Sequence, residues 1–165
     1  MPVTYGEGRF DAAGLRVAVV VAMFNDQITK RLADGALALA AEYGVRDGDL
    51  AVYWVPGAFE IPIVVQRLAE EGDVDAVCAV GAVIRGETPH FELVAGETTR
   101  ALMEIGRETG VPVGNGVIAT NNLAQAEARA GGAVGNKGAE AMYAALHTAC
   151  LLREIDGRTE IETRA

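Results

Sequence analysis

The sequence is short of cysteine, of aromatic residues and of basic charge. Among its 165 residues there are 2 cysteines, aromatic residues make up 5%, and 14 Lys and Arg stand against 23 Asp and Glu, for a formal net charge of −9. This acidic balance is unusual for a nonspecific nucleic-acid binder or for a protein of anionic membranes, so we expect neither partner. Cys78 and Cys150 are too few for a disulfide framework and lie in apolar runs, so we expect buried free thiols in a reducing compartment.

Long hydrophobic runs are also missing. The longest uncharged apolar run with a strand pattern lies within residues 75–85 and is too short to cross a bilayer. The chain starts with neither a basic segment nor an apolar stretch, so we expect no signal peptide and a cytoplasmic protein. Apolar residues make up 50% and charged residues 22%, which excludes a disordered chain. We expect one domain over residues 1–165, with a polar, frayed C-terminal tail from about residue 156.

Apolar runs alternate with amphipathic stretches along the chain. Asn25 is expected to cap the first helix through its side-chain oxygen, and Gly44 to end it. Strands that are apolar on both faces indicate a parallel sheet covered on each side. We therefore expect an α/β protein with a three-layer α/β/α, flavodoxin-like arrangement of four parallel strands, to which residues 3–5 could add a short edge strand. The pattern predicts strands over residues 15–24, 50–55, 75–85 and 113–120, and helices over residues 26–43, 59–71, 88–109, 122–130 and 136–155.

Four loops follow the predicted strands at one edge of the sheet. Ligands of such sheets bind beyond the carboxyl ends of the strands, so we expect the site there. The two histidines and two cysteines fall on different elements, so we expect no metal site. The loops in question cover residues 24–25, 56–60, 84–90 and 120–122.

Two glycine-rich segments imitate nucleotide-binding motifs. Residues 114–119 have the spacing of a dinucleotide fingerprint but precede a strand instead of joining a strand to a helix. Residues 131–137 resemble a phosphate loop, but Asn136 stands where Gly should precede Lys137, and Gly138 stands where Ser or Thr is needed. The sequence therefore argues against a nucleotide site at either place.

The third loop has the features of an anion site. Thr88 can cap the following helix, Pro89 suits its first position, and His90 falls in its first turn. A helix start presents free N–H groups and a positive dipole end to phosphate, and an imidazole there can exchange protons near neutral pH. The alternative is an ordinary capped helix start with a solvated histidine. The carboxylate of Glu87 would repel phosphate unless it points away.

Two aromatic residues directly follow strands. Phe24 and Phe59 could form a stacking surface for a planar ring, and Glu60 could accept hydrogen bonds from hydroxyl groups. The alternative is two core aromatics beside a carboxylate at a helix start. The sequence is compatible with both interpretations.

Four further charged or titratable residues each have a structural and a functional interpretation. Arg85 is either an ion-pair partner or a substrate-binding residue. Arg129 and Lys137 flank a glycine-rich turn and are either solvated surface charges or groups that reach a partner's site. His147 lies in the middle of an apolar helix pattern, where a structural role is favoured.

Taken in order, several segments of the chain resemble lumazine synthase, the penultimate enzyme of riboflavin biosynthesis. The similarity runs over about residues 5–153, and motifs in a fixed order are far more specific than one alone. It implies the condensation of 5-amino-6-(D-ribitylamino)uracil with 3,4-dihydroxy-2-butanone 4-phosphate to 6,7-dimethyl-8-ribityllumazine, with loss of phosphate and water and with no cofactor or metal. The segments that carry it are residues 24–25, 56–62, 81–91, 115–117, 125–131 and 135–138.

The resemblance also implies roles for individual residues. His90 would be the general acid and base, and the backbone N–H of Glu87 with the hydroxyl of Thr88 would contact the phosphate, as would Arg129. Asn115, Arg129 and Lys137 would come from an adjacent subunit, although some family members have an aromatic at the position of Asn115. The residues expected to bind ribitylaminouracil are Phe24, Ala58, Phe59, Glu60, Ala82, Val83, Ile84, Asn115 and Lys137.

The same resemblance implies assembly into homo-oligomers. Family members form pentamers, and some pack twelve pentamers into 60-subunit icosahedral shells. The segment 129–137 carries no long insertion, which leaves a shell open. The alternative function is a non-catalytic, flavin- or ribityl-binding or shell-forming protein of the same fold.

Overall fold

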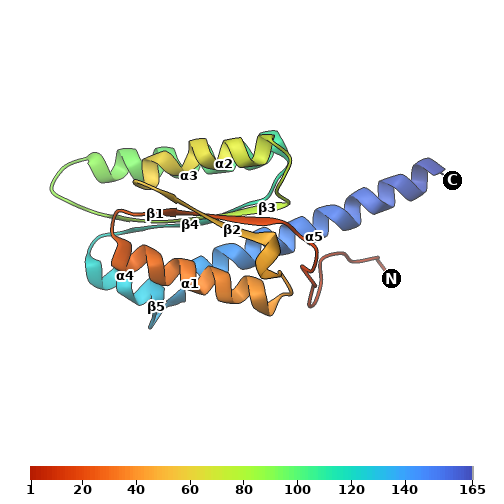
Figure 1. The fold of residues 1–165 in the computed structure, drawn as a ribbon, viewed down its shortest axis with the longest axis horizontal. Helices are drawn as coiled ribbons and strands as arrows, with labels where there is room; N and C mark the ends of the chain where they lie inside the picture. The colour runs from red at the N-terminus through yellow and green to blue at the C-terminus, as the bar shows by residue number, and fades with distance from the viewer. Residues whose placement is uncertain (165) are drawn as a thin grey trace.

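A parallel β-sheet between two layers of helices forms the body of the protein in the computed structural model, which describes residues 1–164 (Figure 1). The predicted three-layer α/β/α fold is therefore confirmed. In chain order the elements are β1 (Val17–Ala22), α1 (Asp26–Glu42), the 3-10 turn η1 (Asp47–Asp49), β2 (Leu50–Val55), the 3-10 turn η2 (Ala58–Glu60), α2 (Ile61–Glu70), β3 (Ala76–Ile84), α3 (His90–Thr109), β4 (Val113–Thr120), α4 (Leu123–Arg129), β5 (Ala130–Gly132), β6 (Gly135–Asn136) and α5 (Lys137–Arg164).

The main sheet has the order β2-β1-β3-β4, and every pair of neighbours is parallel. The carboxyl ends of all four strands therefore meet at one edge. Along β3 the last residue paired with β1 is Val80, opposite Val21, whereas the pairing with β4 continues to Ile84. The last residues of β3, after Val80, therefore have no strand beside them on the β1 side. The loop after β1 faces this edge.

Alternate side chains of the strands enter two separate apolar cores. Odd-numbered residues of β1 pack with α1 and α5, and even-numbered residues pack with α2 and α3. Figure 1 shows the same division, with α2 and α3 above the sheet and α1, α4 and α5 below it. The largest fully buried side chains include Leu32 and Leu146 on one face and Ile61 and Val65 on the other.

The α1–α5 contact depends on the absence of side chains. A Cβ atom on Gly138 would lie 1.9 Å from the carbonyl oxygen of Leu32, and one on Gly35 would lie 2.3 Å from the Asn136 side chain. The Asn136 amide donates to the carbonyl of Arg31 at 2.9 Å. Glycine therefore lets the two helices approach until backbone touches backbone.

Strand β2 departs from the expectation of a sheet covered on both faces. Val52, Tyr53 and Trp54 keep 38%, 40% and 46% of their surface exposed. The reason is its edge position, since the helices pack on β1, β3 and β4. Residues 3–5 form no strand in this described part of the chain, so the possible edge strand is not present within the single subunit.

Two local expectations have different outcomes. The imidazole of His147 lies 2.8 Å from the Gly6 carbonyl oxygen and packs edge-on against Phe10, so its structural role is confirmed. The predicted frayed tail is wrong up to Arg164, because α5 continues to that residue. No proline interrupts the segment, and residue 165 lies outside the described residues.

The two cysteines are free, as predicted. Cys78 is buried, and the desolvation of its thiol raises its pKa to about 12. Cys150 is only half-buried, so the expectation of two buried thiols holds for one of them.

Candidate active site

A cavity of about 770 Å³ opens at the carboxyl ends of the strands, where the sequence predicts the site. This volume suits a drug-sized or substrate-sized molecule, for which pockets of roughly 300–1,000 Å³ are typical. The lining comes from the end of β3, from the loops after β1, β2 and β3, and from the first turns of α3. It brings together nine of the predicted site residues: Phe24, Ala58, Phe59, Glu60, Ala82, Val83, Ile84, Thr88 and His90.

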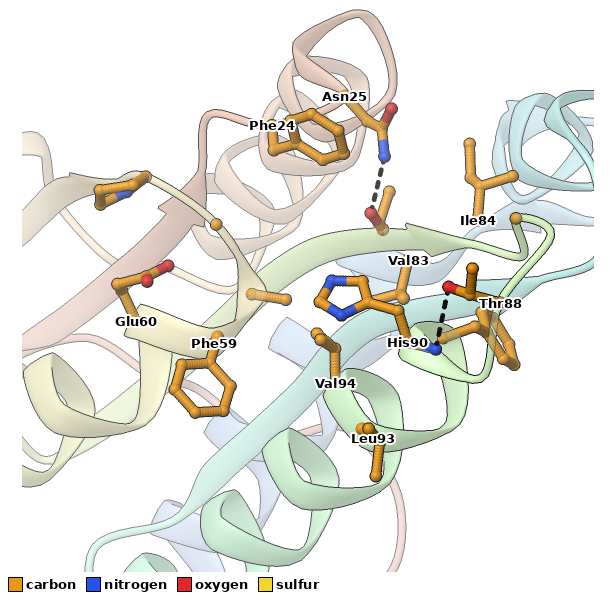
Figure 2. A pocket seen from close by; sticks show the side chains of 16 residues that line it. Phe24, Asn25, Phe59, Glu60, Val83, Ile84, Thr88, His90, Leu93 and Val94 are labelled. Atoms are coloured by element: carbon orange, nitrogen blue, oxygen red, sulfur yellow. Dashed lines mark hydrogen bonds between the residues drawn. The ribbon is translucent and has the colours of Figure 1, made fainter.

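The start of α3 points an imidazole into this cavity. The helix begins at His90, two residues after Thr88, so the predicted start is slightly early. The Thr88 hydroxyl accepts a hydrogen bond from the His90 N–H at 3.4 Å. Figure 2 shows the His90 ring reaching toward the middle of the cavity. The free N–H groups of a helix start favour an anion here, with an acid–base group beside it.

Arg85 is an ion-pair partner, which resolves one open alternative. Its guanidinium pairs with the carboxylate of Glu92, donates to Asn121 Oδ1 at 3.1 Å and lies 4.3 Å from the ring centre of Phe91. The hydrogen bond from Arg85 lowers the pKa of the Glu92 carboxyl below its ordinary value. These contacts tie the end of β3 to the first turn of α3 and to the loop after β4.

The two aromatic residues at the cavity are not core residues. Phe24 is 72% exposed and Phe59 is 67% exposed, so the core alternative is wrong. Their rings point in different directions in Figure 2, so they do not share one stacking surface. Phe24 lies at the edge of the cavity across from His90, where a planar ligand could pack against it.

Glu60 and its neighbours are held by short turns. A Cβ atom on Gly57 would lie 3.2 Å from Glu60 Oε2, so the carboxylate lies over a residue without a side chain. The buried Thr98 hydroxyl of α3 donates to the Ala58 carbonyl at 3.3 Å and fixes η2 against that helix. Sequence reasoning missed Thr98, because a threonine inside a helical pattern gives no sign of its partner.

The prediction that Asn25 caps α1 with its side chain is wrong. The side chain makes no cap hydrogen bond, and its amide donates instead to the Ala82 carbonyl of β3 at 2.9 Å. The Asn25 backbone has a φ of 61°, in the left-handed region, which aims the side chain across the sheet edge. Figure 2 shows this hydrogen bond at the top of the cavity.

Four predicted site residues do not line the cavity. Glu87 is exposed in the loop between β3 and α3, and Asn115 lies exposed on β4. Arg129 donates to the Gln125 carbonyl of its own helix at 3.1 Å, and Lys137 pairs with a carboxylate of its own helix. Within one subunit Asn115, Arg129 and Lys137 are therefore absent from the lining around His90, whereas Glu87 lies in the same loop, next to Thr88.

Two kinds of feature are absent from the described residues 1–164. No helix there combines the length and the apolar character needed to cross a membrane. No group of three or more His, Cys, Asp or Glu side chains is placed there to hold a metal ion.

Comparison with known proteins identifies the family. The model of the 6,7-dimethyl-8-ribityllumazine synthase family matches residues 14–153. The chain belongs to this family. The match covers all the strands and the start of α5, so it includes every element that contributes to the cavity.

Relatives of the same name cover most of this chain. A 6,7-dimethyl-8-ribityllumazine synthase of Thermus thermophilus is 50% identical over 144 residues, which are 87% of this chain and 92% of the relative. One of Nitratidesulfovibrio vulgaris is 47% identical over 149 residues, 90% of this chain and 96% of the relative. One of Gemmatimonas aurantiaca is 52% identical over 141 residues, 86% of this chain and 82% of the relative. The resemblance to lumazine synthase is thus confirmed.

Proposed function

We propose that this chain is an enzyme that condenses 5-amino-6-(D-ribitylamino)uracil with 3,4-dihydroxy-2-butanone 4-phosphate to 6,7-dimethyl-8-ribityllumazine, with release of phosphate and water. Membership of the lumazine synthase family supports this reaction. The observation that carries it in the structure is the His90 imidazole at a helix start inside a cavity of substrate size. The non-catalytic alternative leaves that imidazole without a role.

His90 is the general acid and base of this proposal. The amine of the uracil attacks the ketone, and a first water leaves to form an imine. Phosphate is then eliminated, and the resulting enol becomes a ketone. The second amine attacks this ketone and closes the ring with loss of a second water. Each step moves a proton, and a positioned histidine typically contributes about 10²- to 10⁴-fold to such a rate. Holding the two reactants together contributes further, up to roughly 7–11 kcal/mol in favourable cases.

The pyrimidine and its ribityl chain take the apolar part of the cavity. Phe24 packs on the heterocycle, and the backbone of β3 after Gly81 reads its edge. Glu60 accepts hydrogen bonds from ribityl hydroxyl groups beside the turn that also holds Ala58 and Phe59. The residues proposed for this substrate within one subunit are Phe24, Ala58, Phe59, Glu60, Ala82, Val83 and Ile84.

The phosphate binds at the start of α3. The Thr88 hydroxyl and the backbone N–H of Glu87 are its donors, and the exposed Glu87 carboxylate turns to solvent. Arg129 of an adjacent subunit supplies the cation, and Asn115 and Lys137 of that subunit close the pyrimidine end. This division is supported by the absence of all three residues from the cavity lining of a single subunit.

Assembly into pentamers, or into shells of twelve pentamers, follows from the same proposal. Exposed apolar side chains on β2 and α3, among them Trp54, Leu93 and Met103, are the surfaces that a second copy would cover. We place the assembly in the cytoplasm. Light scattering of the purified protein measures its molar mass, and a monomer would contradict the shared site.

The activity test is a discontinuous assay with both substrates. Product fluorescence and free phosphate should appear together and in equal amounts, faster than in the protein-free mixture. The measured rate must be proportional to protein concentration. A rate equal to the spontaneous reaction would refute the proposed function.

The shared site has a separate test. His90→Ala and Arg129→Ala are each expected to be nearly inactive, but co-expression of the two gives mixed oligomers in which some sites hold both native residues. If neighbours in a ring share each site, about a quarter of the sites in a random equal mixture are complete. Activity no higher than the sum of the two separate variants would place both residues in one subunit.

A further inference from the structure

The loop after β1 lies beside the end of β3, where β3 has no neighbouring strand on the β1 side. Along β3, the N–H groups of Val77 and Arg85 donate toward the β4 side, to Pro112 and Thr120. Because the amides of a strand alternate sides, those of even-numbered residues face β1. The pairing with β1 ends at Val80, so the amides of the next even residues face the cavity edge without a strand beside them.

Asn25 takes the place of the missing strand at this point. Its side-chain amide donates to the Ala82 carbonyl at 2.9 Å, on the side where a β1 amide would otherwise donate. On the other side of the loop, the Met23 and Phe24 N–H groups donate to Val55 and Pro56 at 2.8 and 3.0 Å. The loop is therefore held between β2 and β3, by backbone on one side and by a side chain on the other.

The Asn25 backbone begins the helix that follows, while its side chain is turned away from the helix to Ala82. Among the residues that the structure describes, it is the one non-glycine residue with a positive φ, 61°. The first turn of α1 uses the Asn25 carbonyl, which accepts from Ile28 and Thr29 at 2.9 and 3.0 Å. A left-handed residue at a ligand-facing loop is retained where its surroundings require it.

This arrangement fixes the position of Phe24 in the loop. Its ring is 72% exposed, so packing does little to fix its position. Its backbone N–H donates to Pro56, and the hydrogen bonds of Met23 and Asn25 hold the chain on either side of it. Figure 2 shows the Phe24 ring and the Asn25 side chain at the same end of the cavity.

We propose that Asn25 is a positioning residue, which holds the Phe24 ring over the cavity through its hydrogen bond to the Ala82 carbonyl. This inference rests on the proposed function, in which Phe24 packs on the heterocycle of ribitylaminouracil. Asn25 itself acts through Phe24 and not on the phosphate substrate. Loss of its side chain therefore weakens the binding of ribitylaminouracil and leaves the binding of the butanone phosphate unchanged.

The kinetic test uses Asn25→Gly, because glycine accepts a φ of 61° without strain and removes only the side chain. The KM for ribitylaminouracil should rise about tenfold, as expected for the loss of one well-formed hydrogen bond. The KM for the butanone phosphate and kcat at saturation should change less than about twofold. Asn25→Asp keeps the left-handed tolerance but loses the donor, and it should behave the same way.

The Phe24→Ala background decides whether Asn25 acts through the ring. If it does, Asn25→Gly has no further effect on the KM for ribitylaminouracil once Phe24 is removed. A full tenfold effect in that background would overturn the inference. Asp11→Ala is the matched control, since it removes a 2.9 Å side-chain hydrogen bond to Ala13 N ahead of β1. It should leave both KM values unchanged.

A second readout does not depend on turnover. In a Trp54→Phe, Phe24→Trp protein, the introduced indole is the single tryptophan, and its fluorescence anisotropy reports the mobility of position 24. Asn25→Gly should lower the anisotropy and Asp11→Ala should not. Equal anisotropy, or unfolding of both Asn25 variants, would overturn the inference. An inactive wild type with this anisotropy change would instead refute the proposed function alone.

Discussion

At the α1–α5 contact, the backbone of one helix touches the backbone of the other, whereas at the edge of the cavity the exposed Phe24 ring follows a loop that a single side-chain hydrogen bond of Asn25 ties to β3. Gly138 illustrates the first region and Phe24 the second. Close packing resists any added atom, because interiors transmit strain. The cavity edge tolerates change in shape but loses function when an orientation is lost. Stability and activity should therefore respond to different substitutions.

The largest expected effect is at the packed contact. In Gly138→Ala the new Cβ would lie 1.9 Å from the Leu32 carbonyl oxygen, and backbone cannot move aside as a flexible side chain can. We expect a loss of about 3 kcal/mol or more in the free energy of unfolding, measured by urea denaturation. Gly157→Ala, in the same helix with nothing within 4 Å, should be neutral or slightly stabilising. Equal effects at both positions would contradict the role of close packing.

The next largest effect is at the cavity, on activity alone. His90→Ala should lower kcat by about 10²-fold or more, because proton transfer is lost. The imidazole is exposed, so urea denaturation should show an unchanged free energy of unfolding. A stable variant with native kcat would remove His90 from the mechanism, and an unstable one would remove the contrast between the two regions.

Thr98 is buried like the first region but bonds a residue of the cavity lining, so its effect should be intermediate. In Thr98→Val, a side chain of the same shape leaves the Ala58 carbonyl without its buried partner, which should cost about 1–3 kcal/mol of unfolding free energy. The neighbouring Thr99 hydroxyl donates within its own helix and is exposed, so Thr99→Val should change the free energy of unfolding by less than about 0.5 kcal/mol. Similar losses in both variants would show that the hydrogen bond to η2 is not the cause.

The smallest effect is that of the exposed Arg85–Glu92 pair. Arg85 lowers the pKa of Glu92, so the folded state binds this proton more weakly than the unfolded state. The pair therefore stabilises the fold at neutral pH, and this contribution is lost as the pH falls through the lowered pKa. The stability difference between wild type and Arg85→Gln, measured by urea denaturation across pH, should shrink on acidification. A difference that grows at acid pH would contradict this sign.

The sequence predicted the order and type of the main elements because apolar runs and helix signals are local. Gly44 ends α1 with a φ of 94°, as predicted, and Asn122 caps α4 by accepting from Gln125, three residues along the chain. The partner of Asn25 lies 57 residues away on β3, and no local pattern reports it. Likewise, the exposure of Trp54 follows from the place of β2 in the sheet order, which composition does not determine. The local sequence pattern therefore did not predict contacts between residues that are far apart in the chain, or the order of the strands.

The glycines of β4 have a consequence for how the pocket's chemistry is kept in alignment. A Cβ atom on Gly114 would lie 2.1 Å from the Ala141 carbonyl oxygen, and one on Gly116 would lie 2.7 Å from that of Ala79. A slip of β4 by one residue would put Asn115 into such a place and is sterically forbidden. The small, uniformly apolar side chains of β3 would not by themselves oppose a slip, because a shifted pairing would bury them equally well. The glycines at positions 114 and 116 thus allow one register of β4 and exclude the register shifted by one residue, which keeps each amide opposite its partner.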